Sequence, residues 1–263
     1  MNVCILRTAC ALTIVIASLC ACSGPPTAPV PSGLAASHVR PLIVTAADVK
    51  RVEAWGPKGQ VAVAQCPQGD KVVAGGSSSS DGSFVGAGYA NSGSTAWIVK
   101  PSRSSASAEA FASCVSRSTA GQSFRWRVAF PRNGLASAQC RVGDVLVTGY
   151  ATGTVKDSWF DSATNTFWVD GGGTAHASCA GGYAGIVVRH AWNKSQKPKI
   201  VFAGCGKGYA VLGGSMGDSA WPGPPIQEHP GEASGPASHG YDGWWTFSNA
   251  NNELTWAACV RSS

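Results

Sequence analysis

The sequence predicts an all-β fold of three repeated units of short antiparallel strands, with one disulfide in each unit. The first observation is a pattern that occurs three times, in residues 61–76, 135–150 and 200–214: an apolar strand, a cysteine, a glycine turn, a second apolar strand and a Gly-rich exit. The second observation is that a cysteine opens and another closes each repeat. The third is composition. Charged residues make up only 13% of the chain and Gly contributes 33 of its 263 residues, which fits tight turns between strands and excludes a coiled coil.

Composition also excludes two other classes of protein. Hydrophobic residues make up 44% of the chain and include ten Trp, so the chain can bury a core and is not expected to be disordered. The formal net charge of +6 is spread along the sequence. It therefore argues against a dedicated nucleic-acid surface, and we expect no nucleic-acid partner.

Residues 1–21 are predicted to be a secretory signal peptide. Arg7 precedes an apolar stretch from Ala9 to Leu19, which is shorter than the roughly 20 residues that span a bilayer. The order Leu19-Cys20-Ala21-Cys22 resembles the lipobox of bacterial lipoproteins, in which a cysteine is acylated and becomes the new amino terminus. The resemblance implies cleavage after Ala21 and lipidation of Cys22. It places the chain on the extracytoplasmic face of the cell membrane, with the lipid bilayer as its partner.

Residues 22–37 are predicted to be the lipidated cysteine and a tether. Ser23 to Ala36 reads SGPPTAPVPSGLAA, which has four Pro and no charge and therefore favours an extended, semi-rigid spacer. Residues 38–263 are then expected to form a single β domain, with repeats at about 51–116, 125–181 and 187–260. Thr45 and Asp48 stand at the spacing of a capping box, which indicates a short helix over Thr45 to Glu53.

Three copies of such a unit predict closed three-fold pseudo-symmetry, because one unit alone exposes an unpaired strand edge and cannot bury its apolar face. A β-prism of three sheets and a β-trefoil both satisfy this requirement. The repeats are longer than those usual for a trefoil. We therefore expect a prism-like arrangement, with the trefoil as the alternative.

Six cysteines remain after removal of the signal and acylation of Cys22. They are Cys66, Cys114, Cys140, Cys179, Cys205 and Cys259. An even number in an exported chain indicates a disulfide framework, although sequence alone leaves fifteen connectivities open. Internal repetition favours Cys66 with Cys114, Cys140 with Cys179 and Cys205 with Cys259, with a bridge between repeats as the alternative. The two nearest of these thiols are 26 positions apart, which is not the spacing of a zinc site, and we expect no metal and no cofactor.

The Cys-Pro-x-Gly…Trp…Ala-x-Cys pattern is clearest between Cys66 and Cys114, and it resembles modules that recur in exported actinobacterial proteins. With the lipobox and the tether, the chain resembles mycobacterial-type lipoproteins of undefined activity. The resemblance implies a location and a fold rather than a reaction. The second repeat departs from the pattern, with Arg141 in place of Pro and Tyr150 in place of the second Gly.

Aromatic residues divide into a repeated and an unrepeated group. Trp97, Trp168 and Trp245 recur once in each repeat and are expected to be core residues that pack against the disulfides. His176 stands where the other repeats have Phe111 and Trp256, and it is expected to be a partly buried strand residue.

The unrepeated group gives the candidate ligand surface, which comprises Trp159, Phe160, Trp221, Tyr241 and Asp242. The first two lie in a loop of the second repeat, and the other three in the long segment 215–243 of the third. A solvent-facing Trp beside acidic residues and Tyr is typical of a surface that binds sugar.

Residues Gly213 to Gly217 match the G-x-S-x-G motif of hydrolases, with Ser215 as the nucleophile and Asp218, His229, His239 and Asp242 downstream. The motif requires a strand-to-helix turn, and here it coincides with the Gly-rich exit of the repeat, so no catalytic residue is assigned. We expect a membrane-anchored exported binding or structural module of the cell envelope that recognises glycan or protein through its loops. The alternatives are a hydrolase that uses Ser215 and a carrier of apolar ligands.

Overall fold

The computed structural model describes residues 42–80, 85–101, 103–182, 184–192, 199–217, 234–236, 243–248 and 254–262. Residues 40–263 form one compact unit, distinct from residues 1–39. The predicted signal peptide, the tether and Cys22 lie outside the described residues. So do Trp221, Tyr241 and Asp242 of the candidate ligand surface.

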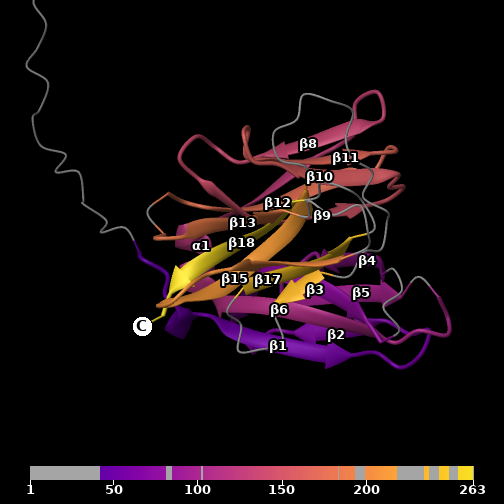
Figure 1. Cartoon of the computed structure of the whole chain (residues 1–263), viewed down its shortest axis with the longest axis horizontal. Coiled ribbons are helices and arrows are strands. Elements are labelled where there is room, and N and C mark those ends of the chain that lie inside the picture. Colours follow the sequence, from indigo (N-terminus) through magenta and orange to yellow (C-terminus); the bar gives the residue numbers. More distant parts are fainter. Residues whose placement is uncertain are drawn as a thin grey trace, which may run out of the picture. The chain divides into compact units, whose positions relative to one another are not determined.

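The strands fall into three successive units that follow the predicted repeats (Figure 1). Unit 1 contains β1 (Lys50–Trp55), β2 (Ala62–Gln65), β3 (Asp70–Ser79), β4 (Val85–Ala90), β5 (Ala96–Pro101) and β6 (Ala108–Ser116). Unit 2 contains β7 (Phe124–Ala129), β8 (Leu135–Gln139), β9 (Val145–Thr152), β10 (Asp157–Asp161), β11 (Thr166–Asp170) and β12 (Thr174–Ala180). Unit 3 contains β13 (Val187–Trp192), β14 (Lys199–Gly204), β15 (Tyr209–Gly217), β16 (Ser234–Pro236), β17 (Gly243–Ser248) and β18 (Leu254–Arg261).

Each unit is a sandwich of two three-stranded antiparallel sheets. The inner sheet takes the first, sixth and third strands of the unit, as in β1-β6-β3, and the outer sheet takes the second, fifth and fourth, as in β2-β5-β4. A single pair, Ser234 with Ser77, also joins the outer sheet of unit 3 to the inner sheet of unit 1. The predicted all-β fold of three similar units is confirmed.

One disulfide joins the two sheets of each unit. The pairs are Cys66–Cys114, Cys140–Cys179 and Cys205–Cys259, as internal repetition predicted. The first cysteine of each pair follows the second strand of the unit, and the other lies in the sixth strand. The bridge therefore fixes the outer sheet to the inner sheet at one end of the sandwich.

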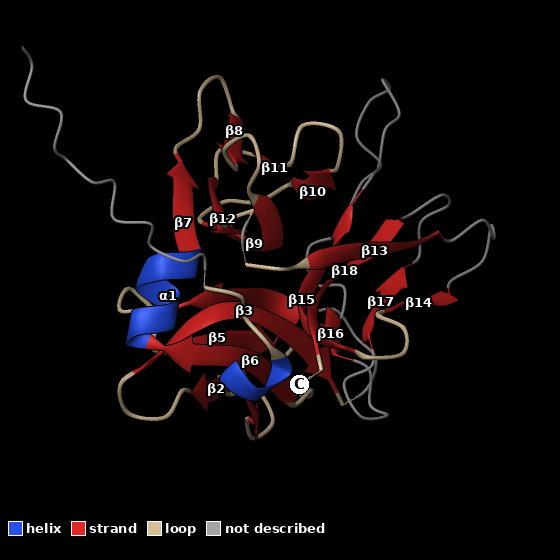
Figure 2. Cartoon of the chain, turned by 90° about the vertical axis from the view of Figure 1, so that its left-hand side faces the viewer, coloured by secondary structure: helices blue, strands red, loops and turns tan. Residues whose placement is uncertain are grey.

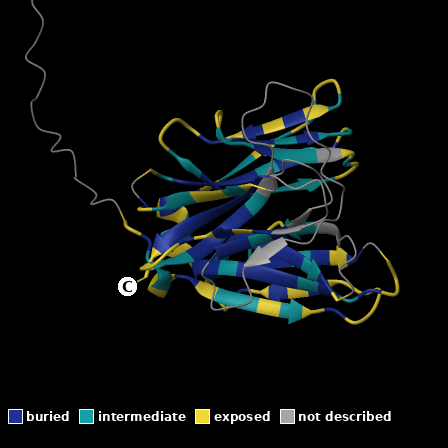
Figure 3. Cartoon of the chain, viewed as in Figure 1, coloured by how far each residue is buried: buried dark blue, intermediate teal, exposed yellow. Residues whose placement is uncertain are grey.

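The third strands β3, β9 and β15 meet where the three lobes of Figure 2 converge. Each has a β-bulge at the same position, because its pairing with the sixth strand skips one residue: Val73, Val147 or Leu212. A bulge redirects a side chain, and here all three skipped residues are buried in one shared core. Figure 3 shows this burial concentrated in the central strands. The bulges thus supply the core of the pseudo-three-fold axis.

Within each sandwich, one aromatic ring lies on a glycine of the third strand. The rings are Trp97, Phe167 and Trp244, and the glycines are Gly75, Gly149 and Gly214. A Cβ on any of these glycines would lie less than 3.0 Å from the ring, closer than real Cβ atoms come. Glycine here makes room for the ring that fills the sandwich.

The expectation that Trp168 and Trp245 are the core rings was wrong by one position. In these units the rings inside the sandwich are Phe167 and Trp244, whereas Trp168 and Trp245 are half-buried on the opposite face of their strands, and Trp245 packs against the core of unit 1. Consecutive residues of a strand point to opposite faces, so aligning Trp with Trp across the repeats placed the wrong member of each aromatic pair inside.

Two short helices flank unit 1. The segment Ala46–Asp48 is a 3₁₀ turn, and the Asp48 carboxylate accepts a hydrogen bond from the Thr45 amide at 2.8 Å. The helix expected over Thr45 to Glu53 stops there, because the chain enters β1 at Lys50. Helix α1 (Arg117–Ser123) was not predicted, and its first turn is capped by the Ser116 hydroxyl, which accepts from the Thr119 amide. Within the described part of the chain, no helix is long and apolar enough to cross a membrane.

Candidate functional site

Comparison of the three units separates residues that serve the fold from candidates for function. Positions that match in all units, such as the bulge and the glycine beneath the ring, build the scaffold. A residue that differs in one unit is not required by the shared fold. It is a candidate for function where it places an aromatic, polar or charged side chain on the surface. Two surfaces meet this criterion.

The first surface is the outer face of unit 2, where two tryptophans lie side by side. Trp159 of β10 and Trp168 of β11 are directly opposite in the antiparallel pairing. Their ring centroids are 5.9 Å apart, their planes differ by 7°, and both residues are half-buried. Ser137 of β8 is the next residue in the same row, and it is exposed. We call Trp159, Trp168 and Ser137 the tryptophan face.

Polar groups flank the tryptophan face. On one side the exposed Gln139 donates from Nε2 to the Thr164 carbonyl oxygen at 3.0 Å. On the other side the Asp170 carboxylate accepts from the Gly171 amide at 2.8 Å and lies 3.7 Å from the Lys156 ammonium. These contacts hold hydrogen-bonding side chains in fixed positions at the edges of an aromatic surface.

The matching rows of the other units do not pair two indoles. In unit 1 the register gives Tyr89, Ile98 and Val63, and in unit 3 it gives Gly235, Trp245 and Phe202. The paired tryptophans are therefore a property of unit 2 alone. They are not a requirement of the outer sheet.

Phe160 does not belong to this surface, and its assignment to the ligand surface was wrong. Its side chain is 4% exposed and packs on Trp256 of unit 3, with ring centroids 4.4 Å apart. In the strand Asp157–Asp161, Trp159 points outward and Phe160 inward, as alternation along a strand requires. Phe160 instead fills the border between units 2 and 3.

Ser215 lies inside a strand. All five residues from Gly213 to Gly217 belong to β15, and Ser215 pairs with Trp256 of β18. A nucleophile elbow needs a sharp strand-to-helix turn at the serine, and an extended strand does not present the hydroxyl in that way. The downstream Asp218, His229, His239 and Asp242 lie outside the described residues.

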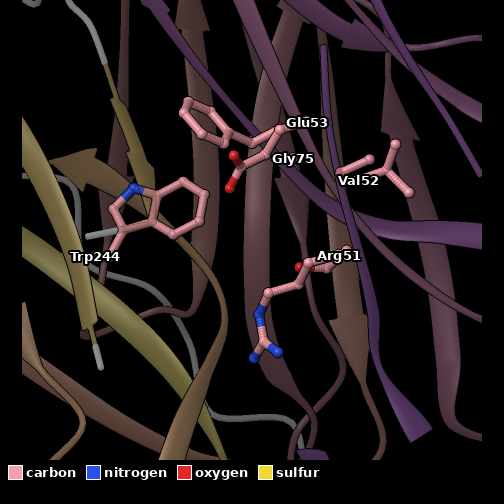
Figure 4. Close-up of a pocket in the computed structure, with 8 residues that line it drawn as sticks. Arg51, Val52, Glu53, Gly75 and Trp244 are labelled. Atoms are coloured by element: carbon pink, nitrogen blue, oxygen red, sulfur yellow. The ribbon is translucent and has the colours of Figure 1, made fainter. Parts of the chain in front are cut away.

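The second surface is a recess at the border between units 3 and 1, shown in Figure 4. It is shallow, because its enclosed volume is only about 10 Å³, the room that one water molecule takes, and the rest of the space at its mouth is open to solvent. The described residues that line it are Arg51, Val52, Glu53, Gly75, Phe111, Ala112, Ser113 and Trp244. Figure 4 shows Trp244 of unit 3 opposite the side chains of Arg51 and Glu53 from β1. Arg51 also crosses the border, since its Nη2 donates to the Val211 carbonyl oxygen at 2.5 Å.

The corresponding border between units 1 and 2 is filled by Tyr150. Its ring stacks on His176, with centroids 4.3 Å apart, and lies 5.4 Å from both Trp97 and Trp126. Burial raises the pKa of Tyr150 to about 12, so its phenol stays protonated. His176 is half-buried, as predicted, and burial lowers its pKa.

Gly76 takes the place of Tyr150 at the border of units 3 and 1. The register shows this equivalence, because Tyr150 pairs with His176 and Gly76 pairs with Phe111. A glycine contributes no ring, and the recess lies on this border. The replacement of a Tyr by Gly76, which departs from the internal symmetry, thus accounts for the position of the recess.

Two carboxylates and an exposed indole stand beside the recess. Across the β1–β6 pairing, Trp55 faces Glu109 and Glu53 faces Phe111. Trp55 is 54% exposed. Burial and the neighbouring charge of Glu53 raise the pKa of Glu109 to about 7, and a hydrogen bond from the Trp55 side chain acts in the opposite direction.

The other units carry no carboxylate at these positions. Unit 2 has Val128 and Thr174 where unit 1 has Glu53 and Glu109. Unit 3 has His190 and Leu254. Inspection of single motifs missed this pair, but an alignment of the first and sixth strands of the repeats would have found it.

No model of a known protein family matches the sequence, and no curated protein is significantly similar to it. Among the described residues, no group of three or more His, Cys, Asp or Glu side chains is placed to hold a metal ion.

Proposed function

We propose that the chain is an exported, lipid-anchored protein that binds glycan through the tryptophan face of unit 2. The lipobox-like segment ending at Cys22 and the uncharged tether support the anchor. The three disulfides support an oxidising compartment, since such bonds form and persist outside the cytosol. The anchored protein would display its β domain in the cell envelope.

The observation that carries the proposed binding function is the pair of parallel indole rings beside hydrogen-bonding side chains. A pyranose ring has an apolar C–H face that stacks on an indole, while its hydroxyl groups need donors and acceptors at the rim. Trp159 and Trp168 supply the stacking surface, and Ser137, Gln139 and Asp170 supply the polar rim. This combination fits a sugar better than a wholly apolar ligand.

The scaffold also favours binding. The two tryptophans lie on paired strands of a sheet that Cys140–Cys179 ties to the inner sheet. A preorganised surface loses little conformational entropy when a ligand binds, which helps a weakly interacting ligand such as a sugar. The interiors of the three sandwiches are filled by Trp97, Phe167 and Trp244, so the geometry favours this surface over the interior cavity that an apolar-ligand carrier would use.

A glycan array tests the proposal. The full chain, purified in detergent, is compared with Trp159→Ala and Trp168→Ala. Tyr89→Ala serves as the control, because Tyr89 is the counterpart of Trp159 in unit 1. We expect the parent and the control to bind the same glycans, and each tryptophan variant to lose about twofold to tenfold in affinity, the size of one lost stacking contact of about 0.5–1.5 kcal/mol. Absence of binding by the parent, or equal binding by all four proteins, would contradict the proposal.

A further inference from the structure

The end of the β domain that carries the disulfides is also the end at which the chain enters the fold, and we call it the entry end. Lys50 opens β1 and pairs with Cys114 of the first disulfide. Shortly before β1, the Val44 amide donates to the Ala184 carbonyl oxygen at 3.0 Å. The C-terminus lies at the same end in Figure 1. Residues from both ends of the domain sequence thus meet at the entry end.

Three exposed apolar side chains lie at the entry end. They are Leu42, Ile43 and Val142. Ile43 lies beside the turn after β12, because a Cβ on Gly185 would lie 3.1 Å from its Cγ2. Val142 lies beside the same turn, because a Cβ on Gly182 would meet the carbonyl oxygen of Gly143. None of the three belongs to a buried core, so packing does not account for them.

Exposed cations lie close to these side chains, and we call them the entry cations. They are Arg117, Arg141, Lys207 and Arg261. Each unit has one of them at the turn after its first cysteine: Arg141 and Lys207 lie in that turn, and the Arg117 amide donates to Gly69 of the turn in unit 1. Arg261 pairs with Thr45, two residues after Ile43. Positive charge therefore recurs around the whole entry end.

Carboxylates are fewer at this end, and most of them have partners within the chain. Among the described residues they are Asp48, Asp70, Asp144 and Asp161. Asp70 pairs with the Lys50 ammonium at 3.0 Å, and Asp48 and Asp161 accept hydrogen bonds from backbone amides of their own turns at 2.8 and 2.9 Å. Lys71 and Arg125 add further positive charge. Charge complementarity favours an anionic partner for the entry end.

The combination of apolar side chains and cations favours a lipid surface over a soluble anion. Proteins that bind to the membrane surface bury apolar side chains at the boundary of headgroups and acyl chains, while Lys and Arg interact with anionic lipids. A soluble anion would use the cations and leave Ile43 and Val142 in water.

The length of the chain before the domain agrees with a lipid partner. Residues 22–41 separate the predicted lipidation site from the first described residue, Leu42. At the extension of a Pro-rich spacer these residues span at most about 60 Å. The proposed anchor would thus keep the entry end within reach of the membrane.

We infer that the entry end docks directly on an anionic phospholipid bilayer. Leu42, Ile43 and Val142 enter the headgroup region, and the entry cations contact the lipid phosphates. The inference rests on the proposed anchor for the approach to the membrane, whereas the contact itself is independent of the acyl chains. Docking would fix the orientation in which the domain displays the tryptophan face.

Co-sedimentation with lipid vesicles tests this inference on the fragment Ser23 to Ser263. Residues 40–263 form one compact unit that contains the three disulfides and the buried cores, so the fragment keeps the folded part. It has neither the apolar signal nor Cys22, so failure of docking is measured separately from failure of the anchor. The vesicles are phosphatidylcholine alone and an equal mixture of phosphatidylcholine and phosphatidylglycerol. We expect about tenfold or more tighter binding to the mixed vesicles, and weaker binding as salt is added.

Matched variants test which end of the domain binds. Arg141→Gln and Lys207→Gln should each weaken binding to the mixed vesicles about fivefold, the effect of one charge near an anionic surface. Val142→Ser should weaken it about threefold to tenfold. The controls are Arg132→Gln and Phe130→Ser, which change an exposed cation and an exposed aromatic ring after β7, at the opposite end of unit 2. Both controls should bind as the parent does.

Several outcomes would overturn the inference. These are equal binding to both kinds of vesicle, no binding to the mixed vesicles, and parental binding by all three entry-end variants. An equal loss in Arg132→Gln and Phe130→Ser would show that the opposite end binds. Binding of soluble polyphosphate in preference to vesicles, with no effect of Val142→Ser, would assign the entry end to an acidic polymer instead of lipid.

Discussion

Gly149→Ala is expected to destabilise the protein, although it adds only one methyl group. A Cβ at this position would lie 2.7 Å from Cε2 of Phe167 and closer still to two other ring atoms. Phe167 is 3% exposed and fills the space between the two sheets of unit 2, so the ring has no room to move aside. Over-packing of a core costs about 1–3 kcal/mol, and an overlap of this depth belongs at the upper end.

A smaller opposing effect comes from the unfolded chain. Alanine has fewer accessible backbone states than glycine, which stabilises a folded protein by up to about 1 kcal/mol where the native conformation permits it. The net expected cost is therefore about 2 kcal/mol. In a domain of this size that lowers the melting temperature by roughly 4–8 °C.

Thermal unfolding under non-reducing conditions measures the effect. Gly121→Ala is the matched control, because Gly121 lies in helix α1 with nothing within 4 Å of its added Cβ, and it should be neutral or stabilising by up to about 1 kcal/mol. The double variant Gly149→Ala with Phe167→Leu should cost less than the sum of its two single changes. Parental stability of Gly149→Ala, or strict additivity in the double variant, would refute the reasoning.

Three further predictions follow from the disulfides, Glu109 and the anchor. Replacing Cys140 and Cys179 by Ala should lower the free energy of unfolding by about 4 kcal/mol, the value that the chain-entropy model gives for a sequence separation of 39. A loss below about 1 kcal/mol in denaturant titrations would contradict this prediction. The pKa of Glu109 in the folded protein is about 7, above its usual 4.5, so between these pH values the folded state keeps a proton that the unfolded chain loses. The free energy of unfolding should therefore fall as the pH rises from about 4.5 to 7. Glu109→Gln should flatten that slope in denaturant titrations at several pH values, and an unchanged slope would contradict the assignment. Cys22→Ala should shift the protein from the membrane fraction to the soluble fraction, and retention in the membrane would contradict the lipobox interpretation.

The repeat pattern predicted much of the fold because the same local requirements recur in each unit. The cysteines at 66, 140 and 205 each precede a glycine turn and an apolar strand, and this order was sufficient to give the disulfide pairing. The bulges at Val73, Val147 and Leu212 were not predicted. The sequences around them are ordinary apolar runs. The extra residue that each bulge adds to the third strand is explained only by the packing of three units around one axis.

The errors at the candidate sites have a common cause in strand alternation. The sequence prediction matched Trp168 and Trp245 to Trp97, although Trp168 and Trp245 each have an aromatic neighbour in sequence that points to the opposite face of the strand. It also assigned Phe160 and Trp159 to one surface, although these two side chains point to opposite faces of β10. Glu53 and Glu109 were missed because they are distant in sequence and form no motif. Their proximity depends on the β1–β6 register, and their significance depends on comparison with Val128 and Thr174 of unit 2.

The most direct test of the central claim follows the indole N–H signals of the protein by NMR while a glycan from the array is added. Signals of Trp159 and Trp168 are assigned from single Phe variants. Glycan binding at the tryptophan face predicts that these two signals shift together with one dissociation constant, and that the signal of buried Trp97 stays in place. Glycan binding that shifts other indole signals and leaves both Trp159 and Trp168 unchanged would contradict it.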